Sequence, residues 1–437
     1  MRNKPLALLL LSYVGAGMLA ACTEITSLKQ SNPGAIEATK VYVPSNALLL
    51  VNGAIADFEC AFTRYVVGSG VLSDELGNAI GQQANYDLDA RRLLTNGTYG
   101  TTSCGVGANQ VPPIYVPLST ARGAADVVIA RLMEWTDAEM PANVNRTRLI
   151  AQAYAYAGYS LTLMGEGMCN AAINVGPMLT PAQLYDTAKA RFDSAIAYAN
   201  KVTPNTAADV TLRNFATLGR ARVELNQGNG AAAAADAAAI PSGFVVNTST
   251  DAVNARRQNF AFVFINNNSF GTVDPTFRGL TLGAGNDPRV AVTNSGRNGT
   301  AANAPQVWTV DKYNALTAVM PIAKYAEAQL ILADTRAAAN DLPGAEAAIN
   351  AARNTRPGMP QYSATGLTQA EVQAQIIEER RRELFLEGHR LGDIRRYNIA
   401  LAPAASSAYP GGGLYGPQNC FPLPDVERLN NPNIPKP

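Results

Sequence analysis

The sequence predicts a mainly all-α fold: a frame of antiparallel helix pairs that carries long irregular loops and a few short strands. Apolar residues recur at helical spacing through most of the chain from Pro117 onward, as in Leu184, Ala188, Phe192 and Ala195. Alanine and glycine are abundant, whereas aromatic residues make up only 7% of the chain. That balance favours closely packed helices over a β-sandwich. With 437 residues and 47% hydrophobic content, the chain can bury the core of one large or two medium domains.

The individual helices have recognisable starts and stops. Thr180 and Gln183 form a capping box, and Thr368 and Glu371 form another. Helices are expected over 46–72, near 150–164, and over 181–199, 207–227, 231–239, 322–333, 344–354 and from 369 into 378–398. Short turns and small residues separate these segments, which therefore resemble tetratricopeptide repeats over about 118–240 and 318–398. A generic helical bundle is the alternative that periodicity leaves open.

Three segments lack a helical stripe and are expected to be loops. The insert 241–317 is rich in Asn, Gly, Thr and aromatic residues, and Phe260, Phe262 and Phe264 alternate there as in a strand. Residues 73–117 and the C-terminal segment 399–437 are similarly irregular. Long loops on a rigid frame are the usual place for a binding site.

The N-terminus predicts export and a lipid anchor. Residues 1–21 have the basic start, short apolar core and small residues of a secretory signal. The stretch Leu19-Ala20-Ala21-Cys22 resembles the bacterial lipobox, in which the Cys is acylated and becomes the new N-terminus. An ordinary signal with an incidental Cys is the alternative. We expect residues 22–45 to be the lipidated tether and 46–437 a single domain, with no later segment apolar enough to span a bilayer.

Four further cysteines, Cys60, Cys104, Cys169 and Cys420, fit two disulfides in an exported protein. Three pairings are possible, and the sequence does not choose among them. The chain has no CxxC motif and one histidine, so neither a zinc site nor any other metal or cofactor site is expected.

Residues 378–398 are the most highly charged stretch, with 11 Arg, Glu or Asp among 21 residues. Glu379, Glu383 and Glu387 are spaced to line one helical face, with arginines three residues away that can brace them. This pattern predicts a structural helix whose charges brace one another and neighbouring helices. His389 falls on that helix, so we interpret it as structural too.

Several catalytic classes are excluded by missing residues. A hydrolase triad could use only His389, and no GxSxG or HExxH motif is present. Residues 411–416 match GxGxxG but follow no expected strand and open no helix, so we interpret them as a flexible loop. A formal net charge of +1 gives no reason to expect a nucleic-acid partner. No catalytic residue is therefore predicted.

The charged stretch also carries a family resemblance. Residues 379–396 follow the pattern E-R-R-x-E-L-x-x-E-G-x-R and then D-[LI]-x-R, which is similar to the C-terminal signature of the SusD/RagB family. The segments 324–328, 350–353, 286–289, 420–424 and 430–433 resemble further motifs of that family, in the same order. The chain departs from the pattern at Leu391-Gly392, where an aromatic pair is common, and it is short for the family. The signature residues, expected to be structural, are Arg380, Glu383, Glu387, Arg390, Asp393 and Arg396.

The resemblance implies a function. SusD-like proteins are lipoproteins on the outer face of the outer membrane in Bacteroidota and related bacteria. They bind a nutrient, usually a glycan, and cover a TonB-dependent, SusC-like transporter. The resemblance therefore implies a glycan-binding protein with a transporter partner and a lipid anchor, and no enzyme activity. A carboxylate-dependent glycoside hydrolase and a peptide-binding repeat scaffold are the alternatives.

The loops contain side chains that are suited to binding a sugar. Flat aromatic side chains can meet the apolar face of a sugar ring, while Asn and Arg can bond its hydroxyls. The loop aromatics are Tyr86, Tyr99, Tyr115, Phe270, Phe277, Trp308, Tyr313, Tyr409 and Tyr415. The residues we predict for the ligand site are Trp308, Tyr86 and Tyr99, with Asn78, Asn85 and Arg92 as polar partners.

Overall fold

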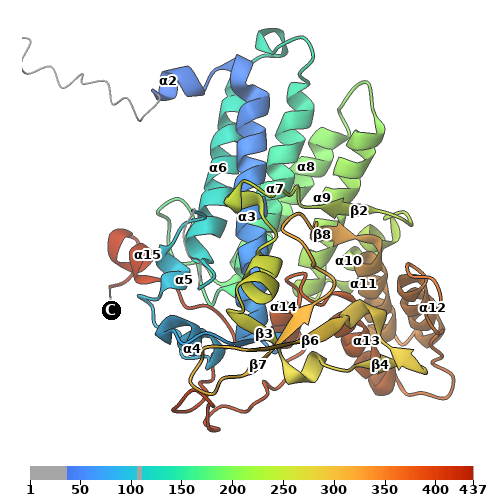
Figure 1. Ribbon diagram of the computed structural model, residues 1–437. Helices are drawn as coiled ribbons and strands as arrows, with labels where there is room; N and C mark the ends of the chain where they lie inside the picture. Colours follow the sequence, from blue (N-terminus) through green and yellow to red (C-terminus); the bar gives the residue numbers. More distant parts are fainter. Residues whose placement is uncertain (1–36, 106–110, 437) are drawn as a thin grey trace, which may run out of the picture.

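In the computed structural model, which describes residues 37–105 and 111–436, helices form a stacked frame and short strands gather at one end (Figure 1). Helices that follow one another in the sequence pack side by side from α6 to α12, which confirms the all-α, helical-pair prediction. The main helices are α3 (Ala47–Leu72), α6 (Tyr115–Glu134), α7 (Arg146–Gly167), α8 (Pro181–Ala199), α9 (Ala207–Asn226), α10 (Gly230–Ala238), α11 (Tyr325–Ala338), α12 (Leu342–Arg353), α13 (Gln369–Glu383) and α14 (Arg390–Arg396).

The remaining elements are short. Four helices of four to seven residues are α2 (Ala38–Val41), α4 (Gln83–Asp89), α5 (Thr98–Thr101) and α15 (Asp425–Asn430). The strands are β1 (Leu76–Asn78), β2 (Val245–Asn247), β3 (Gly271–Val273), β4 (Thr281–Leu282), β5 (Gly285–Asn286), β6 (Val292–Asn298), β7 (Gln306–Val310) and β8 (Pro321–Lys324). They pair antiparallel as β1–β3, β2–β8, β4–β5 and β6–β7.

Both predicted capping boxes are present. At the start of α8 the Thr180 backbone N–H donates to Gln183 Oε1 at 2.9 Å, and Gln183 N–H donates back to Thr180 Oγ1 at 3.4 Å. At α13 the Thr368 backbone N–H donates to Glu371 Oε2 at 2.7 Å. Each box satisfies backbone donors that a helix start would otherwise leave free, which explains why these helices begin where they do.

Small residues allow the central helices to approach closely. A methyl group built on Gly219 of α9 would lie 2.4 Å from ring atoms of Phe192, and one on Gly158 of α7 would lie 2.7 Å from the same ring. Phe192 of α8 is completely buried between the two glycines. The close contact of α7, α8 and α9 therefore depends on the absence of side chains at these two positions.

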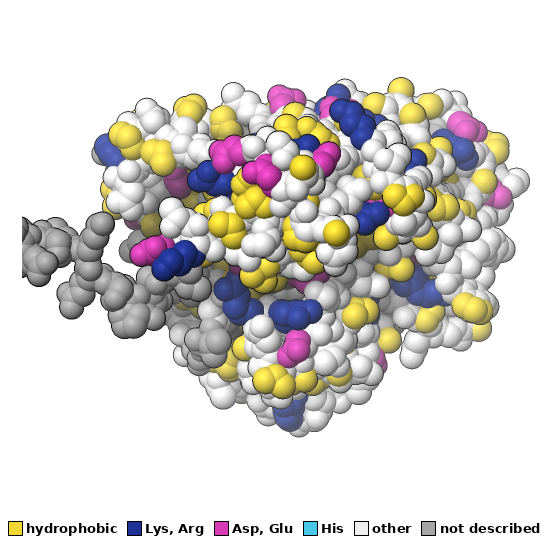
Figure 2. Space-filling model, turned by 90° about the horizontal axis from the view of Figure 1, so that it is seen from above, with side chains coloured by type: hydrophobic (Ala, Val, Ile, Leu, Met, Phe, Trp, Pro, Cys, Tyr) yellow, Lys and Arg dark blue, Asp and Glu magenta, His cyan; other side chains and the backbone are white. Residues whose placement is uncertain are grey.

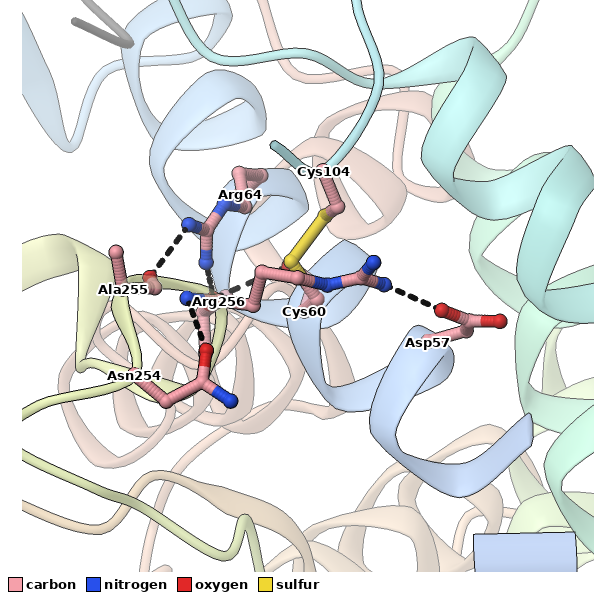
Figure 3. Close-up of a disulfide and its surroundings, with 8 residues drawn as sticks. Asp57, Cys60, Arg64, Cys104, Asn254, Ala255 and Arg256 are labelled. Carbon is pink, nitrogen blue, oxygen red and sulfur yellow. Dashed lines mark hydrogen bonds and ion pairs between the residues drawn. A yellow bond between two sulfur atoms is a disulfide. The ribbon is translucent and has the colours of Figure 1, made fainter. Parts of the chain in front are cut away.

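Two disulfides fasten the loops to the frame. Cys60 of α3 pairs with Cys104, and Cys169 pairs with Cys420. Next to the first bridge, Arg64 Nη2 of α3 donates to the carbonyl of Ala255 at 3.2 Å, as Figure 3 shows. The second bridge joins residues 251 positions apart and so holds the C-terminal segment against the end of α7. These pairs decide which of the three possible pairings is formed.

One local prediction from the insert is wrong. Phe260 and Phe264 do not lie in a strand; residues Phe262–Asn267 form a short π-helix, η4. Phe260 and Phe264 are both buried with ring centroids 5.9 Å apart, while Phe262 is half-buried. Phe260 and Phe264 fit both a four-residue helical repeat and a two-residue alternation, so their spacing alone could not separate the two structures.

None of the helices within residues 37–105 and 111–436 is long and apolar enough to span a membrane. The expected signal peptide, 1–21, and Cys22 lie outside the described residues, as does most of the expected tether. The division into signal, tether and a single domain stays a prediction.

Candidate ligand-binding site

The signature segment is not one continuous helix. Helix α13 ends at Glu383, and the chain turns sharply through Leu386 and Gly388, which have φ angles of 52° and 76°. Helix α14 then begins at Arg390, directly after His389. The expectation that one helix runs through the whole segment is therefore wrong, because these positive φ angles are incompatible with a continuing helix.

The three glutamates of the segment pair with cations from other parts of the chain. Glu379 pairs with Arg289 and Arg353. Glu383 pairs with Lys324 at 2.9 Å and also with Arg356. Glu387 pairs with Lys312 and with the same Lys324 at 2.7 Å. The carboxylates thus tie α13 and the following turn to distant segments.

The arginines of the signature also form ion pairs that connect it to other helices. Arg380 makes a two-pronged contact to Asp393 of α14, with both distances 2.9 Å. Arg390 reaches Asp74, just after α3, with both distances 2.6 Å. Arg396 pairs with Asp334 of α11. The predicted bracing of neighbouring helices is present. Within α13 it is Glu378 that pairs with Arg381 and Arg382, whereas Glu379, Glu383 and Glu387 pair with other segments in place of the arginines three residues away.

His389 lies in a buried charged cluster. Its side chain is almost fully buried, and its Nε2 lies 3.2 Å from Arg222 Nη1. Nη2 of the same arginine pairs with Glu166 at 2.6 Å. Burial, followed by Arg222 and other cations, lowers the pKa of His389 well below its ordinary value. A neutral histidine held by Arg222 in the interior agrees with a structural role.

The loops bring aromatic and basic residues together at the end of the frame where α4 lies (Figure 1). Tyr86 of α4 packs edge-on against Tyr409 of the C-terminal segment, with ring centroids 6.0 Å apart. Tyr409 packs in the same way against Tyr415 at 5.0 Å. The guanidinium of Arg92 lies 5.7 Å from the Tyr409 ring, and that of Arg91 lies 4.8 Å from Tyr415. We call these five residues the tyrosine–arginine cluster.

The glycine-rich stretch 411–416 packs on this cluster. A methyl group on Gly411 would lie 2.5 Å from the Tyr409 ring and 2.6 Å from the Tyr86 ring. Arg92 Nη2 donates to the carbonyl of Gly412 at 3.4 Å. The glycines therefore let the backbone cover aromatic rings, and the motif does not form a nucleotide-binding turn.

Beneath the cluster lies Asp89. Its Oδ2 accepts hydrogen bonds from the Tyr409 hydroxyl at 2.8 Å and from the Asn78 backbone N–H at 3.1 Å. Burial raises the pKa of Asp89 to about 6, despite these two hydrogen bonds. The carboxylate fixes Tyr409 in place and so orients the cluster.

The predicted ligand residues take different positions. Tyr86 and Arg92 are half-buried members of the cluster. The amide of Asn78 bonds the backbone of Ile80, and Asn85 Nδ2 donates to Gln82 Oε1 at 3.2 Å. Both asparagines are buried, so their amide groups face the protein interior.

The two other predicted aromatics lie outside the cluster. The exposed fraction of Tyr99 is 1%, and its hydroxyl donates to the carbonyl of Pro422 at 2.8 Å. Trp308, on β7, is half-buried and has Arg278 over its ring at 5.3 Å. Tyr99 is almost fully buried, although it is one of the residues that line a hollow between α4 and α5. Trp308 contacts Arg278 in place of the cluster. The assignment of ligand residues stays a prediction.

A hollow of about 220 Å³ lies between α4 and α5, and Tyr99 is part of its lining. Its lining includes Gln83, Asp87, Leu94 and Asn96. Asp87 is the one carboxylate among the described residues of this lining. Hydrolysis of a glycosidic bond needs two facing carboxylates, and the described lining of this hollow does not hold such a pair.

The comparisons with known proteins agree with the sequence motifs. Residues 274–423 match the model of the SusD family. The resemblance to the SusD/RagB family is confirmed. No curated protein matches the chain.

Solved SusD-like structures have the same fold. Surface glycan-binding protein A from Bacteroides thetaiotaomicron superposes with a TM-score of 0.66 at 14% identity, covering 90% of this chain and 98% of its own. A SusD superfamily protein from Bacteroides fragilis gives 0.66 at 16% identity, covering 90% and 99%. A laminarin binding SusD-like protein gives 0.63 at 16% identity, covering 89% and 98%. At these identities the likeness shows the SusD-like fold.

Proposed function

We propose that this SusD-like chain binds an oligosaccharide at the cell surface and delivers it to a TonB-dependent transporter of the outer membrane, without cleaving it. The observation that supports binding most directly is the tyrosine–arginine cluster, carried on loops of a rigid helical frame. Two of the solved proteins with this fold are described as glycan-binding and laminarin binding.

The cluster has the surface chemistry that a neutral sugar needs. Tyr86 and Tyr415 are half-buried, so part of each ring is available to the apolar face of a pyranose. Among the described residues, the guanidinium of Arg92 makes one hydrogen bond, a long one to Gly412, which leaves further N–H groups for sugar hydroxyls. Binding of this kind needs neither a metal nor a nucleophile. No group of His, Cys, Asp and Glu suited to a metal ion lies among the described residues.

The position of the cluster fits a tethered protein. The described chain enters at α2, beside the N-terminal end of α3, while α4 and the cluster lie at the other end of α3 (Figure 1). Helix α3 has 26 residues, and at 1.5 Å per residue it is ~39 Å long. A lipid at Cys22 would therefore hold the molecule by the end opposite the proposed ligand site.

The charge distribution on the face of the molecule seen in Figure 2 gives no support for a nucleic-acid partner. Figure 2 shows basic, acidic and hydrophobic side chains interspersed on this face, without a single basic patch. Nucleic-acid binding depends on clustered cations that neutralise phosphates.

Titration calorimetry with the soluble form from Thr23 onward tests glycan binding. The probes are laminarin and a panel of other oligosaccharides. We expect Tyr86→Ala and Arg92→Ala each to weaken binding about ten-fold, equivalent to ~1.4 kcal/mol. Tyr198→Ala is the matched control, because Tyr198 is a half-buried tyrosine of α8 that stacks on Tyr154 away from the cluster.

The same preparation tests the alternatives. Shortened glycan products after prolonged incubation would support a hydrolase, and binding of peptides with silence across the glycan panel would support a peptide scaffold. Delivery is tested by purifying the membrane-bound protein. We expect a TonB-dependent transporter to co-purify with the native chain, and Cys22→Ser to release the chain from the membrane.

A further inference from the structure

A larger pocket lies on the other side of the molecule from the tyrosine–arginine cluster, where α11, α12 and α13 meet the strand pair β2–β8 (Figure 1). Its volume is about 660 Å³, three times that of the hollow between α4 and α5. The turn before β2, the junction of β8 with α11, the end of α12 and the last residue of α13 form its walls. We call it the α12 pocket. Its lining includes Ser242, Tyr325, Ala351, Asn354, Arg356 and Glu383.

A chain of alternating charges ends at this pocket. From the interior outward it runs Lys312, Glu387, Lys324, Glu383 and Arg356. Lys324 Nζ lies 2.7 Å from Glu387 and 2.9 Å from Glu383, and Lys312 and Arg356 pair with the two ends. Three cations thus face two carboxylates, so these five residues together carry one more formal positive charge than negative charge.

Arg356 is the member of that chain that reaches the pocket. Its side chain is 29% exposed, whereas that of Glu383 is 2% exposed. Only Nη1 of Arg356 has an acceptor, Glu383, among the residues that the structure describes. Because Glu383 holds the guanidinium in place, the edge formed by Nε and Nη2 is oriented in advance. A guanidinium edge of this kind matches the geometry of a carboxylate.

Other lining groups are available for hydrogen bonds. The hydroxyl of Tyr325 has no hydrogen-bond partner within the described part of the chain, and the side chain is half-buried. Ser242 and Asn354 are exposed at the rim. Asn354 Oδ1 accepts from Gln361 Nε2 at 2.8 Å, which leaves its amide N–H groups free to donate.

We propose that the α12 pocket binds a small hydroxylated organic acid, of the size and class of a sugar acid, with its carboxylate on Arg356. The carboxylate supplies the counter-ion that the charge chain lacks, and the ligand hydroxyls meet Tyr325, Ser242 and Asn354. The volume lies within the ~300–1,000 Å³ range of small-molecule sites. A neutral sugar does not supply that counter-ion. This site is separate from the tyrosine–arginine cluster and does not depend on the proposed oligosaccharide binding.

The proposal is tested by a substitution that fills part of the pocket and leaves its charged residues unchanged. Ala351 of α12 lines the pocket, so Ala351→Leu places a larger side chain in it. Ala347→Leu is the matched control, because Ala347 is exposed on the same helix and does not line the pocket. Calorimetry is performed with D-glucuronate, with D-glucose as the neutral analogue and with acetate as a carboxylate without hydroxyls.

We expect wild type and Ala347→Leu to bind glucuronate equally, and Ala351→Leu to bind it at least ten-fold more weakly with an unchanged melting temperature. Glucose and acetate should both bind at least ten-fold more weakly than glucuronate. Failure of wild type to bind glucuronate, equal binding of glucose or acetate, or unchanged binding in Ala351→Leu would each overturn the proposal.

Two milder variants keep the test decisive if Ala351→Leu disturbs the fold. Arg356→Lys keeps the positive charge beside Glu383 but removes the planar edge, and Tyr325→Phe removes only a hydroxyl. Each should weaken glucuronate binding several-fold, and unchanged affinity in both contradicts the proposal. Tyr86→Ala should leave glucuronate binding unchanged, which separates this site from the oligosaccharide site.

Discussion

The buried pair Arg380–Asp393 provides a strong test of the structural role of the signature. Asp393→Asn keeps the shape of the side chain but removes its charge. In the native protein Arg380 Nε and Nη2 each donate to the carboxylate at 2.9 Å, and Arg396 Nη2 donates to it at 3.1 Å. Both members of the pair are almost fully buried, at 4% and 6% side-chain exposure. The substitution therefore leaves a buried guanidinium without its counter-ion.

We expect the free energy of unfolding to fall by about 3–5 kcal/mol, the usual cost of removing one partner from a buried ion pair. Burial alone would raise the pKa of Asp393, but Arg380 and Arg396 lower it below its ordinary value, which shows how strongly the charged form is favoured. Urea denaturation followed by circular dichroism at neutral pH measures the change.

The matched control is Glu134→Gln, which breaks the exposed pair Arg131–Glu134, with side-chain exposures of 44% and 57%. That change should cost less than about 1 kcal/mol. The double variant Arg380→Met/Asp393→Leu should recover much of the loss, because it removes both buried charges. If Asp393→Asn costs no more than Glu134→Gln, the signature pairs do not stabilise the frame and the reasoning is wrong.

Three further predictions concern stability. Burial raises the pKa of Glu75 to about 8, so the stability that this side chain contributes to the wild-type protein should be lost as pH rises from about 4.5 through 8. Glu75→Gln should remove roughly 3–5 kcal/mol of that loss. The measurement compares the urea denaturation curves of the two proteins at pH 5 and at pH 9. Gly219→Ala should destabilise the helix contact by several kcal/mol, whereas Gly123→Ala, with open space around it, should stabilise by about 0.5–1 kcal/mol. Cys420→Ser opens the bridge that closes a 251-residue separation and should lower stability by about 2–5 kcal/mol, seen as a lower melting temperature.

The helical frame could be predicted because its signals are local. The stripe Leu184, Ala188, Phe192 and the capping box at Thr180 lie within a few turns of one another, and each reports on one helix. The same locality explains the errors. The turn at Leu386 depends on contacts with distant segments, including Glu75, whose Oε1 accepts from the Leu386 N–H at 2.8 Å. Nothing near Leu386 in the sequence marks that partner.

The candidate site was only partly predictable for the same reason. Tyr86 and Arg92 could be chosen as loop residues with suitable chemistry, but their neighbours Tyr409 and Tyr415 come from more than 300 residues further along the chain. Asn85 sits next to Tyr86 on a helix of only seven residues. So short a helix shows no apolar periodicity in its sequence. The segments that pack against it therefore determine which of the two adjacent side chains faces inward.

The signature network lies between the two proposed sites and bears on how they behave together. At one end Arg390 holds Asp74, which immediately precedes Glu75 and the strand β1 that leads to Asn78 and the tyrosine–arginine cluster. At the other end Glu383 holds Arg356 in the α12 pocket. A ligand couples two sites only through an element with two discrete arrangements. Buried pairs that satisfy one another strongly favour a single arrangement, so saturating glucuronate should not change the affinity for an oligosaccharide.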